Sequence, residues 1–328
     1  MTSHPTAYSN CNLCPRACGV DRNGSALGYC RSTSKARLAS AVLHRGEEPS
    51  LSTGRGSGAM FFSGCTLRCD SCQNCGISAE GIGRDVDLST LSEIMLRLDA
   101  SGASNINIVT GTHFAPAIVE AVDVARAAGL RLPVVWNTSG YESIKTLEHL
   151  STIVDVWLPD IKTFDPAIAK AMLNAPDYPA RVKDAALWMS SRSTLRYDGD
   201  TLVSGTICRH LVLPGLFDDT ESVLRWYADH LRQSTLLSVM AQYIPTANGG
   251  ETISRSLERS EYDAMIALLW RFDIDSGFVQ ELEDERFWIP DFARANPFPS
   301  QYSDPVWHWR FGFVDSDDRD GVDGGVYC

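Results

Sequence analysis

Four cysteines stand in one short run of the sequence, "FFSGCTLRCDSCQNCG" (61–76). Three thiolates spaced as Cys65-x3-Cys69-x2-Cys72 can hold a [4Fe–4S] cube and leave one iron without a protein ligand. A fourth ligand from Cys75 would instead close the site, which then serves structure or electron transfer as a zinc or iron–sulfur site. Since the run follows an apolar strand, where ligand-binding loops of βα folds lie, we predict three ligands and a small half-buried Cys75.

A second set of cysteines lies near the N-terminus, in "CNLCPRACGVDRNGSALGYC" (11–30). The spacing of Cys11, Cys14, Cys18 and Cys30 is typical of a small metal knuckle, and the intervening glycines permit its turns. Zinc would fold this otherwise coreless segment, whereas a second iron–sulfur cluster could relay electrons to the first. Reduced thiols without metal are the third possibility, and spacing alone does not separate the three.

Apolar runs that predict strands alternate with helical patterns from residue 59 onward. The strand runs are 59–63, 106–110, 132–137, 153–159, 206–214 and 236–243, and a further candidate lies at 36–45. The helical patterns are 89–102, 115–129, 218–233 and 254–272. This alternation predicts right-handed βαβ units and a parallel sheet.

The number of units favours an α/β fold with a partial (β/α)6 TIM-type barrel, and an open doubly wound sheet is the alternative. We expect a Cys-rich N-terminal extension over 1–57, the barrel over 58–283, and a C-terminal strap over 284–328. The strap is rich in proline and aromatic residues, and its last dozen residues are acidic enough to predict disorder.

The composition narrows the class of protein. The formal net charge of −12 argues against nucleic-acid partners and anionic membranes. No run approaches the length of a membrane span, and the N-terminus lacks a signal peptide, so we expect a cytoplasmic protein. Basic residues near the N-terminal cysteines form either a solvated face or a docking face for an acidic electron carrier. They are Arg16, Arg22, Arg31, Lys35 and Arg37.

The cysteine run and its surroundings resemble a known superfamily. "CTLRCDSC" fits the CxxxCxxC signature of radical S-adenosylmethionine (SAM) enzymes, and the following "QN" resembles activating enzymes of glycyl radical enzymes. Further motifs, "CNLCPRACGVDRNG", "NINIVTGTHFAP", "WNTSGYE", "VDVWLPDIK", "RHLVLPG" and "MAQYIP", are similar to the pyruvate formate-lyase activating enzyme-like branch. The motifs span residues 11–245, and they are more specific for the superfamily than for the reaction.

The resemblance implies cofactors, partners and site residues. The cluster would reductively cleave SAM to a 5′-deoxyadenosyl radical, which abstracts hydrogen from a glycyl residue of a partner enzyme, a peptide or a small molecule. A flavodoxin or ferredoxin-like protein would donate the electron. Lys162 and Arg209 are the candidate catalytic residues. The expected cosubstrate-binding residues are Thr110, Thr112, His113, Asn137, Thr138, Ser139, Asp160, Lys162, Arg209 and Gln242, with Tyr243 beside Gln242.

Two positions depart from the superfamily pattern. Ser71 stands where an aromatic residue commonly packs near the adenine, so Phe61 or Phe62 would have to supply that contact. "VTGTHFAP" replaces the expected Gly-Gly-Glu segment, which assigns the amino group of SAM to Thr110, Thr112 and His113, unless His113 is simply a buried histidine. The competing hypothesis for the whole chain is a non-catalytic iron–sulfur or zinc electron-transfer protein, in which Cys75 completes a closed site.

Overall fold

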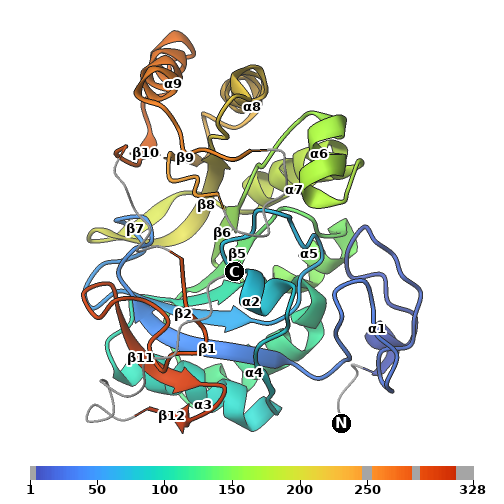
Figure 1. Ribbon diagram of the computed structural model, residues 1–328. Coiled ribbons are helices and arrows are strands. Elements are labelled where there is room, and N and C mark those ends of the chain that lie inside the picture. Colours follow the sequence, from blue (N-terminus) through green and yellow to red (C-terminus); the bar gives the residue numbers. More distant parts are fainter. Residues whose placement is uncertain (1–4, 246–252, 283–288, 315–328) are drawn as a thin grey trace.

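The computed structural model describes residues 5–245, 253–282 and 289–314 (Figure 1). One large sheet organises this part of the chain, with strands in the order β10-β9-β8-β6-β5-β4-β2-β1-β11-β12. β2, β4, β5, β6, β8, β9 and β10 are parallel, whereas β1 is antiparallel to both β2 and β11. Because β10 and β12 end the series, the sheet is an open, partial barrel, as predicted.

Seven strands lie on the predicted apolar runs, namely β1, β2, β4, β5, β6, β8 and β9, whereas β3, β7, β10, β11 and β12 were not predicted. Their bounds are β1 Arg37–His44, β2 Ser57–Phe62, β3 Arg84–Asp85, β4 Ile106–Val109, β5 Val134–Thr138, β6 Val156–Pro159, β7 Arg196–Asp198, β8 Thr201–Leu211, β9 Leu236–Met240, β10 Gly277–Val279, β11 Ser303–His308 and β12 Gly312–Phe313.

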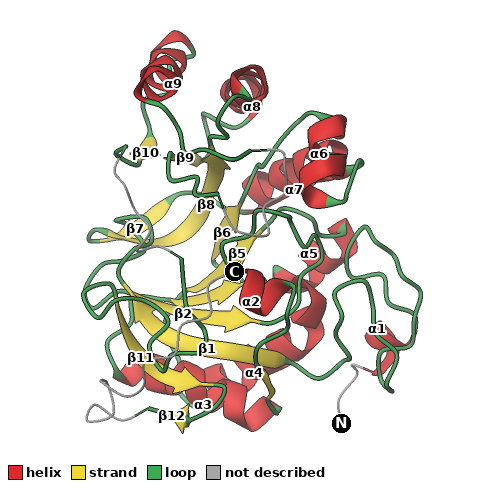
Figure 2. Ribbon diagram, viewed as in Figure 1, coloured by secondary structure: helices red, strands yellow, loops and turns green. Residues whose placement is uncertain are grey.

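Helices connect the parallel strands and cover the outer face of the sheet (Figure 2). Their bounds are α1 Pro5–Ser9, α2 Cys75–Ser78, α3 Leu88–Ala100, η1 Thr112–Phe114, α4 Ala115–Ala127, α5 Ile144–Leu150, α6 Pro166–Leu173, α7 Tyr178–Arg192, α8 Phe217–His230 and α9 Arg259–Arg271. In the described residues, no helix is both long and apolar enough to cross a membrane.

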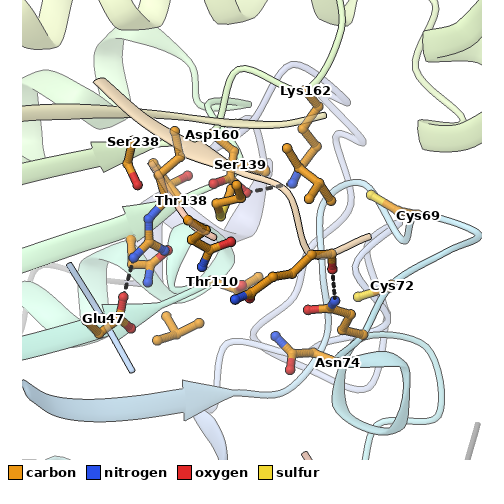
Figure 3. Close-up of a pocket in the computed structure, with 18 of the residues that line it drawn as sticks. Glu47, Cys69, Cys72, Asn74, Thr110, Thr138, Ser139, Asp160, Lys162 and Ser238 are labelled. Atoms are coloured by element: carbon orange, nitrogen blue, oxygen red, sulfur yellow. Dashed lines mark hydrogen bonds and ion pairs between the residues drawn. The ribbon is translucent and has the colours of Figure 1, made fainter. Parts of the chain in front are cut away.

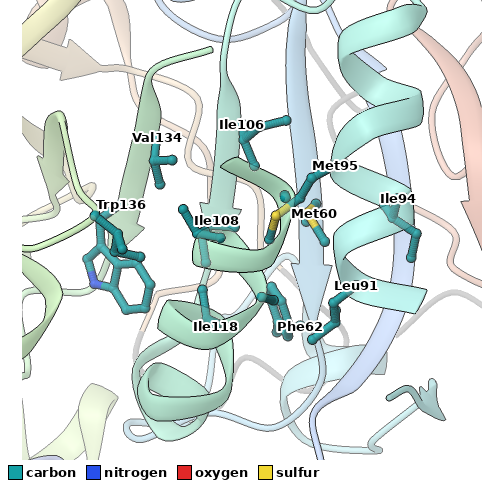
Figure 4. Packing of buried hydrophobic residues seen from close by; sticks show 14 of the residues in the cluster. Met60, Phe62, Leu91, Ile94, Met95, Ile106, Ile108, Ile118, Val134 and Trp136 are labelled. Carbon is teal, nitrogen blue, oxygen red and sulfur yellow. The ribbon is translucent and has the colours of Figure 1, made fainter. Parts of the chain in front are cut away.

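The largest apolar cluster lies between this sheet and helices α3 and α4 (Figure 4). Met60 and Phe62 of β2, with Ile108 of β4, point into it, and Leu91 and Ile118 meet them from the helices. Both β2 and β4 are buried at every position, because helices cover one face of the sheet and the cavity-lining loops the other. This packing fixes the strand ends from which the site is built.

Several elements differ from the sequence prediction. Helices α5, α6 and α7 were not predicted, and α9 begins at Arg259 rather than 254. Within the strap, β11 pairs with β1 and so extends the sheet rather than only lying over it. β1 itself continues the sheet beyond β2, so the sheet runs across the predicted boundary at residue 57. The predicted disorder of the last dozen residues lies outside the described residues.

Candidate functional site

A cavity of about 920 Å³ lies at the carboxyl ends of the parallel strands (Figure 3). One wall is the cysteine loop after β2, which presents Cys69 and Cys72 to the cavity, and the facing wall carries Thr138, Ser139 and Asp160. This is the edge of a βα sheet where ligands gather. Its size is within the usual range of pockets for small-molecule ligands.

The three predicted cluster ligands, Cys65, Cys69 and Cys72, all line this cavity and carry free thiols. Cys65 is buried, and its sulfur accepts a hydrogen bond from the backbone N–H of Leu67 at 3.4 Å. Ser78 Oγ donates to the Cys72 sulfur at 3.3 Å. Burial raises the pKa of both Cys65 and Cys69, so these thiols keep their protons until a metal or another cation stabilises the thiolate.

Cys75 occupies a different environment from the other three cysteines of the run. It is the first residue of α2 and is buried, and it does not line the described cavity. Its sulfur is part of a disulfide bond. A sulfur in a disulfide does not bind metal as a thiolate, so this arrangement favours three ligands over four.

Asp160 and Lys162 form an ion pair inside the cavity, with 2.6 Å between Lys162 Nζ and Asp160 Oδ2. Burial alone would lower the pKa of Lys162, but the carboxylate of Asp160 outweighs burial and raises that pKa, so the ammonium stays charged. The hydroxyl of Tyr178 lies 2.8 Å from the carbonyl of Ser139 and 2.7 Å from that of Asp160, and accepts from Lys162 N–H. Tyr178, which the sequence analysis missed, thereby fixes the two turns that carry these polar residues.

Arg209 lines the cavity but is already paired with two carboxylates. Its Nε donates to Glu48 Oε1 at 2.7 Å and its Nη2 to Glu48 Oε2 at 2.6 Å, and Nη2 also contacts Glu47. The charge of Arg209 is therefore balanced within the protein, and its predicted catalytic and SAM-binding role stays a prediction. The two glutamates were missed, although their position directly after an apolar strand was the available signal.

Thr112 and His113 do not line the cavity, contrary to the sequence prediction. Both lie in the buried turn η1, where Thr112 Oγ1 donates to Glu142 at 2.6 Å and His113 Nε2 lies 2.8 Å from the carbonyl of Ser63. The short turn after β4 points these side chains into the protein, and His113 is the buried histidine of the alternative interpretation. Burial lowers its pKa to about 3.

The remaining predicted positions divide between the cavity and its surroundings. Cavity-lining residues include Thr110, Asn137, Ser71, Phe61 and Gln242, whose carbonyl accepts from Gln73 at 3.2 Å. Phe62 is buried in the core between the sheet and its helices, so Phe61 is the one of these two phenylalanines that could contact the adenine of SAM. Tyr243 is buried in the second apolar cluster.

The N-terminal basic residues bond largely to the protein itself. Arg16 donates to the carbonyls of Thr66, Leu173 and Asn174, and Arg22 is fully buried. Arg31 and Lys35 are exposed, and Arg31 donates to the carbonyl of Ala79 at 3.0 Å, so a docking role for these residues stays a prediction. In the part of the chain that the structure describes, no group of three or more His, Cys, Asp or Glu side chains is placed so that it could hold one metal ion as it stands.

Comparison with known proteins identifies the segment that contains the cysteine loop. Residues 53–162 match the family described as "4Fe-4S single cluster domain", which spans β2 to the Asp160–Lys162 pair. This segment is similar to that family over about a third of the chain. The match supports the predicted [4Fe–4S] cluster, and it agrees with the resemblance of the sequence to the radical SAM superfamily.

Individual relatives of the chain are more distant. The uncharacterized protein MJ0674 of Methanocaldococcus jannaschii is 25% identical over 278 residues, which are 82% of this chain and 76% of that protein. Streptococcus suis SuiB bound to precursor peptide SuiA aligns with a TM-score of 0.47 and 11% identity, covering 66% of this chain. This chain spans about half of the SuiB chain (46%).

A domain of pyruvate-formate lyase-activating enzyme from Bacteroides vulgatus aligns with a TM-score of 0.38 and 9% identity. That alignment covers 51% of this chain and 91% of the domain. Both TM-scores are too low to support a conclusion about activity.

Proposed function

We propose that this protein is a radical SAM enzyme, in which Cys65, Cys69 and Cys72 hold a [4Fe–4S] cluster at the cavity and SAM binds beside it. The observation that carries the proposal is the placement of three free thiols on one wall of a cavity, opposite polar strand ends. Three ligands leave one iron open, and Cys75 lies outside the cavity lining. When bound, the cluster supplies the electron that reductively cleaves SAM.

The residues of this chain have distinct expected roles around SAM. Asn137, Thr138 and Ser139 offer hydrogen-bonding groups at the end of β5 and in the turn after it, and the Asp160–Lys162 pair offers a carboxylate and an ammonium. SAM carries both an amino and a carboxylate group, so a charge pair of this kind can meet both. Arg209 orients Asn137 and the two glutamates, because its Nη1 lies 3.4 Å from Asn137 Oδ1.

The substrate would be a group whose C–H bond can reach the cavity. The sequence resemblance favours a glycyl residue of a partner enzyme, with a peptide or a small molecule as the alternatives. A flavodoxin or ferredoxin-like electron donor is part of the proposal, and so is a cytoplasmic location. The cavity lining includes Gln280 and Glu281 as well as the cysteine loop, which leaves room for a ligand other than SAM.

The test is to reconstitute the protein anaerobically with iron and sulfide, reduce it and add SAM. The proposal expects 5′-deoxyadenosine, detected by liquid chromatography and mass spectrometry, at a rate that depends on reductant. A glycyl radical EPR signal on mixing with a candidate partner would identify the protein substrate. Turnover without that signal would point to a peptide or small molecule.

The competing function is an electron-transfer protein with a closed cluster. It predicts a reducible cluster with four cysteine ligands and no deoxyadenosine under the same conditions. The disulfide at Cys75 disfavours it, since that sulfur is not a free thiolate.

A further inference from the structure

Arg22 is a cation buried inside the N-terminal lobe, which we define as residues 5–35. Its side chain has no exposed surface, and none of the described carboxylates lies within ion-pair distance of it. Its Nε donates to the carbonyl of Ser32 at 3.0 Å and its Nη2 to that of Thr33 at 2.7 Å. The third contact is from Nη1 to the sulfur of Cys11 at 3.4 Å. Burying a charge without a counter-charge costs folding free energy, so an anion beside Arg22 would stabilise the lobe.

The ionisable groups of the lobe that face Arg22 are the thiols of Cys11 and Cys30 and the phenol of Tyr8. The adjacent carboxylate, Asp21, is exposed and accepts hydrogen bonds from Asn23 instead. The Tyr8 ring lies against the guanidinium at 5.0 Å and is buried, and an ordinary phenol is neutral at pH 7. The thiols are therefore the group that can supply negative charge. Free thiols are neutral, however, and a thiol becomes a stable thiolate when it binds a metal.

Two of the four cysteines of the lobe lie beside one glycine, and a third contacts Arg22. A Cβ atom on Gly28 would lie 3.3 Å from the Cys30 sulfur and 3.9 Å from the Cys18 sulfur, so this glycine stands between the two. The backbone N–H of Tyr29 donates to the Cys18 sulfur at 3.3 Å, in the same way that Arg22 donates to Cys11. Two N–H donors aimed at two sulfurs favour the thiolate form of each.

The lobe also lacks a core large enough to fold alone. Its own apolar cluster consists of Tyr8, Cys11 and Leu13, with Val20 packed at the side. A segment this small normally needs a disulfide or a metal, and all four of its cysteines are free. Metal binding would therefore stabilise the folded lobe, and the thiolate ligands would supply the negative charge that Arg22 lacks.

We infer that Cys11, Cys14, Cys18 and Cys30 bind a thiophilic metal centre whose net negative charge is balanced by Arg22. In the described residues the four sulfurs are not arranged around a single ion, so binding one zinc ion would draw them closer together. A divalent zinc ion on four thiolates remains net negative, and so does a four-thiolate iron–sulfur cluster. Binding releases the four thiol protons to solvent, and no oxidation is required. This centre is separate from the proposed cluster at Cys65, Cys69 and Cys72, and it does not depend on the SAM chemistry.

The lobe is in direct contact with the cysteine loop of the cavity. Arg16 stacks on Tyr29 at 3.9 Å and donates to the carbonyl of Thr66, and Tyr29 donates to the carbonyl of Leu67 at 3.3 Å. Both acceptors lie within two residues of Cys65. The metal centre would therefore also order the loop that carries the second set of ligands.

The experiment measures metal in the full chain with Cys65, Cys69 and Cys72 replaced by alanine, so that only the N-terminal cysteines remain as a site. We expect about one zinc, or about four iron with matching sulfide, per chain, measured by elemental analysis of anaerobically purified protein. Bound zinc would identify a structural zinc site, and bound iron with sulfide would identify an iron–sulfur cluster. A protein without bound metal after zinc and iron–sulfide reconstitution, whose four thiols all react with iodoacetamide, would overturn the inference.

The role of Arg22 needs its own variants. In the same background, Arg22→Met should release metal to a chelator about tenfold faster, and Arg22→Lys should recover part of the loss. Lys35→Met is the matched control, because it removes an exposed cation from the same lobe and should leave the release rate unchanged. Equal release rates for Arg22→Met and Lys35→Met would contradict the charge-balancing role, whatever the outcome of the deoxyadenosine assay.

Discussion

The two groups of cysteines in this protein occupy opposite kinds of environment. Cys65, Cys69 and Cys72 follow a buried strand of the sheet and face a cavity with polar residues on its far wall. Two of the N-terminal cysteines instead lie beside a glycine in a lobe with almost no core, and a third contacts a buried arginine. The residue type is the same in both places, but only the first group faces a space where a ligand can bind.

The comparison shows that position on the fold decides what a cysteine motif can do. A loop at the carboxyl edge of a parallel sheet inherits the binding site that the strand ends create. A lobe outside the sheet has no such site, so its thiols can stabilise structure or carry electrons. The two groups should therefore fail differently when they are altered.

Replacing any one of Cys65, Cys69 and Cys72 with alanine should give the largest effect, which is loss of deoxyadenosine formation to below detection. Each thiolate holds one iron of the cube, and a cube with two protein ligands is not retained. The measurement is product formation together with the iron content of the reconstituted protein. Cys208→Ala is the control, since that cysteine is buried in β8 away from the cavity lining and should leave activity intact. Full activity of Cys69→Ala would refute the three-ligand site.

Arg209→Met should lower the free energy of unfolding by about 3–5 kcal/mol, because it leaves Glu47 and Glu48 buried without a cation. Urea titration at pH 7 measures the change. In the wild type, burial alone would raise the pKa of Glu48, but the charge and hydrogen bonds of Arg209 outweigh burial, so the pKa of Glu48 is lowered. The stability from Glu48 is thus complete above the ordinary glutamate pKa and is lost as the pH falls below it.

The variant should reverse that pH dependence. Without Arg209, burial dominates and raises the pKa of Glu48, so Glu48 should take up its proton at a higher pH than in the wild type. The double variant with Glu48→Gln should recover part of the lost stability. If Arg209→Met and the wild type have the same unfolding free energy, the ion-pair network is not stabilising.

A variant of His113 tests whether its buried contact with the carbonyl of Ser63, just before the cysteine loop, stabilises the fold. Its folded pKa of about 3 lies below the ordinary value, so the neutral form is favoured and its stability is present above about pH 6.5. As the pH falls from there toward 3, protonation favours the unfolded state by about 1.4 kcal/mol per pH unit, or about 2 kcal/mol at pH 5. His113→Gln should remove this slope between pH 6.5 and 5, measured by urea unfolding, while the two proteins keep parallel curves at pH 7–8. An unchanged slope would show that His113 does not titrate in this range.

Asp160→Asn should have the smallest effect, an increase of about tenfold in the SAM concentration for half-maximal deoxyadenosine formation, or about 1.4 kcal/mol. The variant keeps the shape of the side chain but removes the charge that holds Lys162 in place. Asp155→Asn is the matched control, because Asp155 lies just before β6 at its other end and pairs with Arg126 away from the cavity. Equal SAM dependence of both variants would remove Asp160 from the site.

Much of the fold could be predicted because its signals are local. The strands of the sheet are apolar runs, and the cysteine loop needs only its own spacing and the strand before it. The partners of these elements are not local. Glu48 and Arg209 are 161 residues apart, and Ser40 of β1 bonds to Trp307 of β11 across 267 residues.

The incorrect site residues have a local cause. Thr112 and His113 follow a strand, as the true cavity residues do, but the turn η1 begins at once and points them inward. Thr110, two residues earlier, has a φ of 59° and lines the cavity. A shift of two residues therefore separates a ligand-facing position from a core position, and no pattern of residue types reports the direction of the turn.

Gly64 lies at the point where the two cysteine regions meet. Its φ is 86°, and a Cβ there would come within 2.6 Å of both the carbonyl of Cys30 and the hydroxyl of Ser32. In a library that samples every amino acid at each position, only glycine at position 64 should allow the protein to fold, although this position contributes no metal ligand. The requirement for glycine at position 64 therefore comes from the N-terminal lobe as well as from the cysteine loop. A natural relative that lacks the N-terminal lobe would be expected to accept other residues more readily at this position.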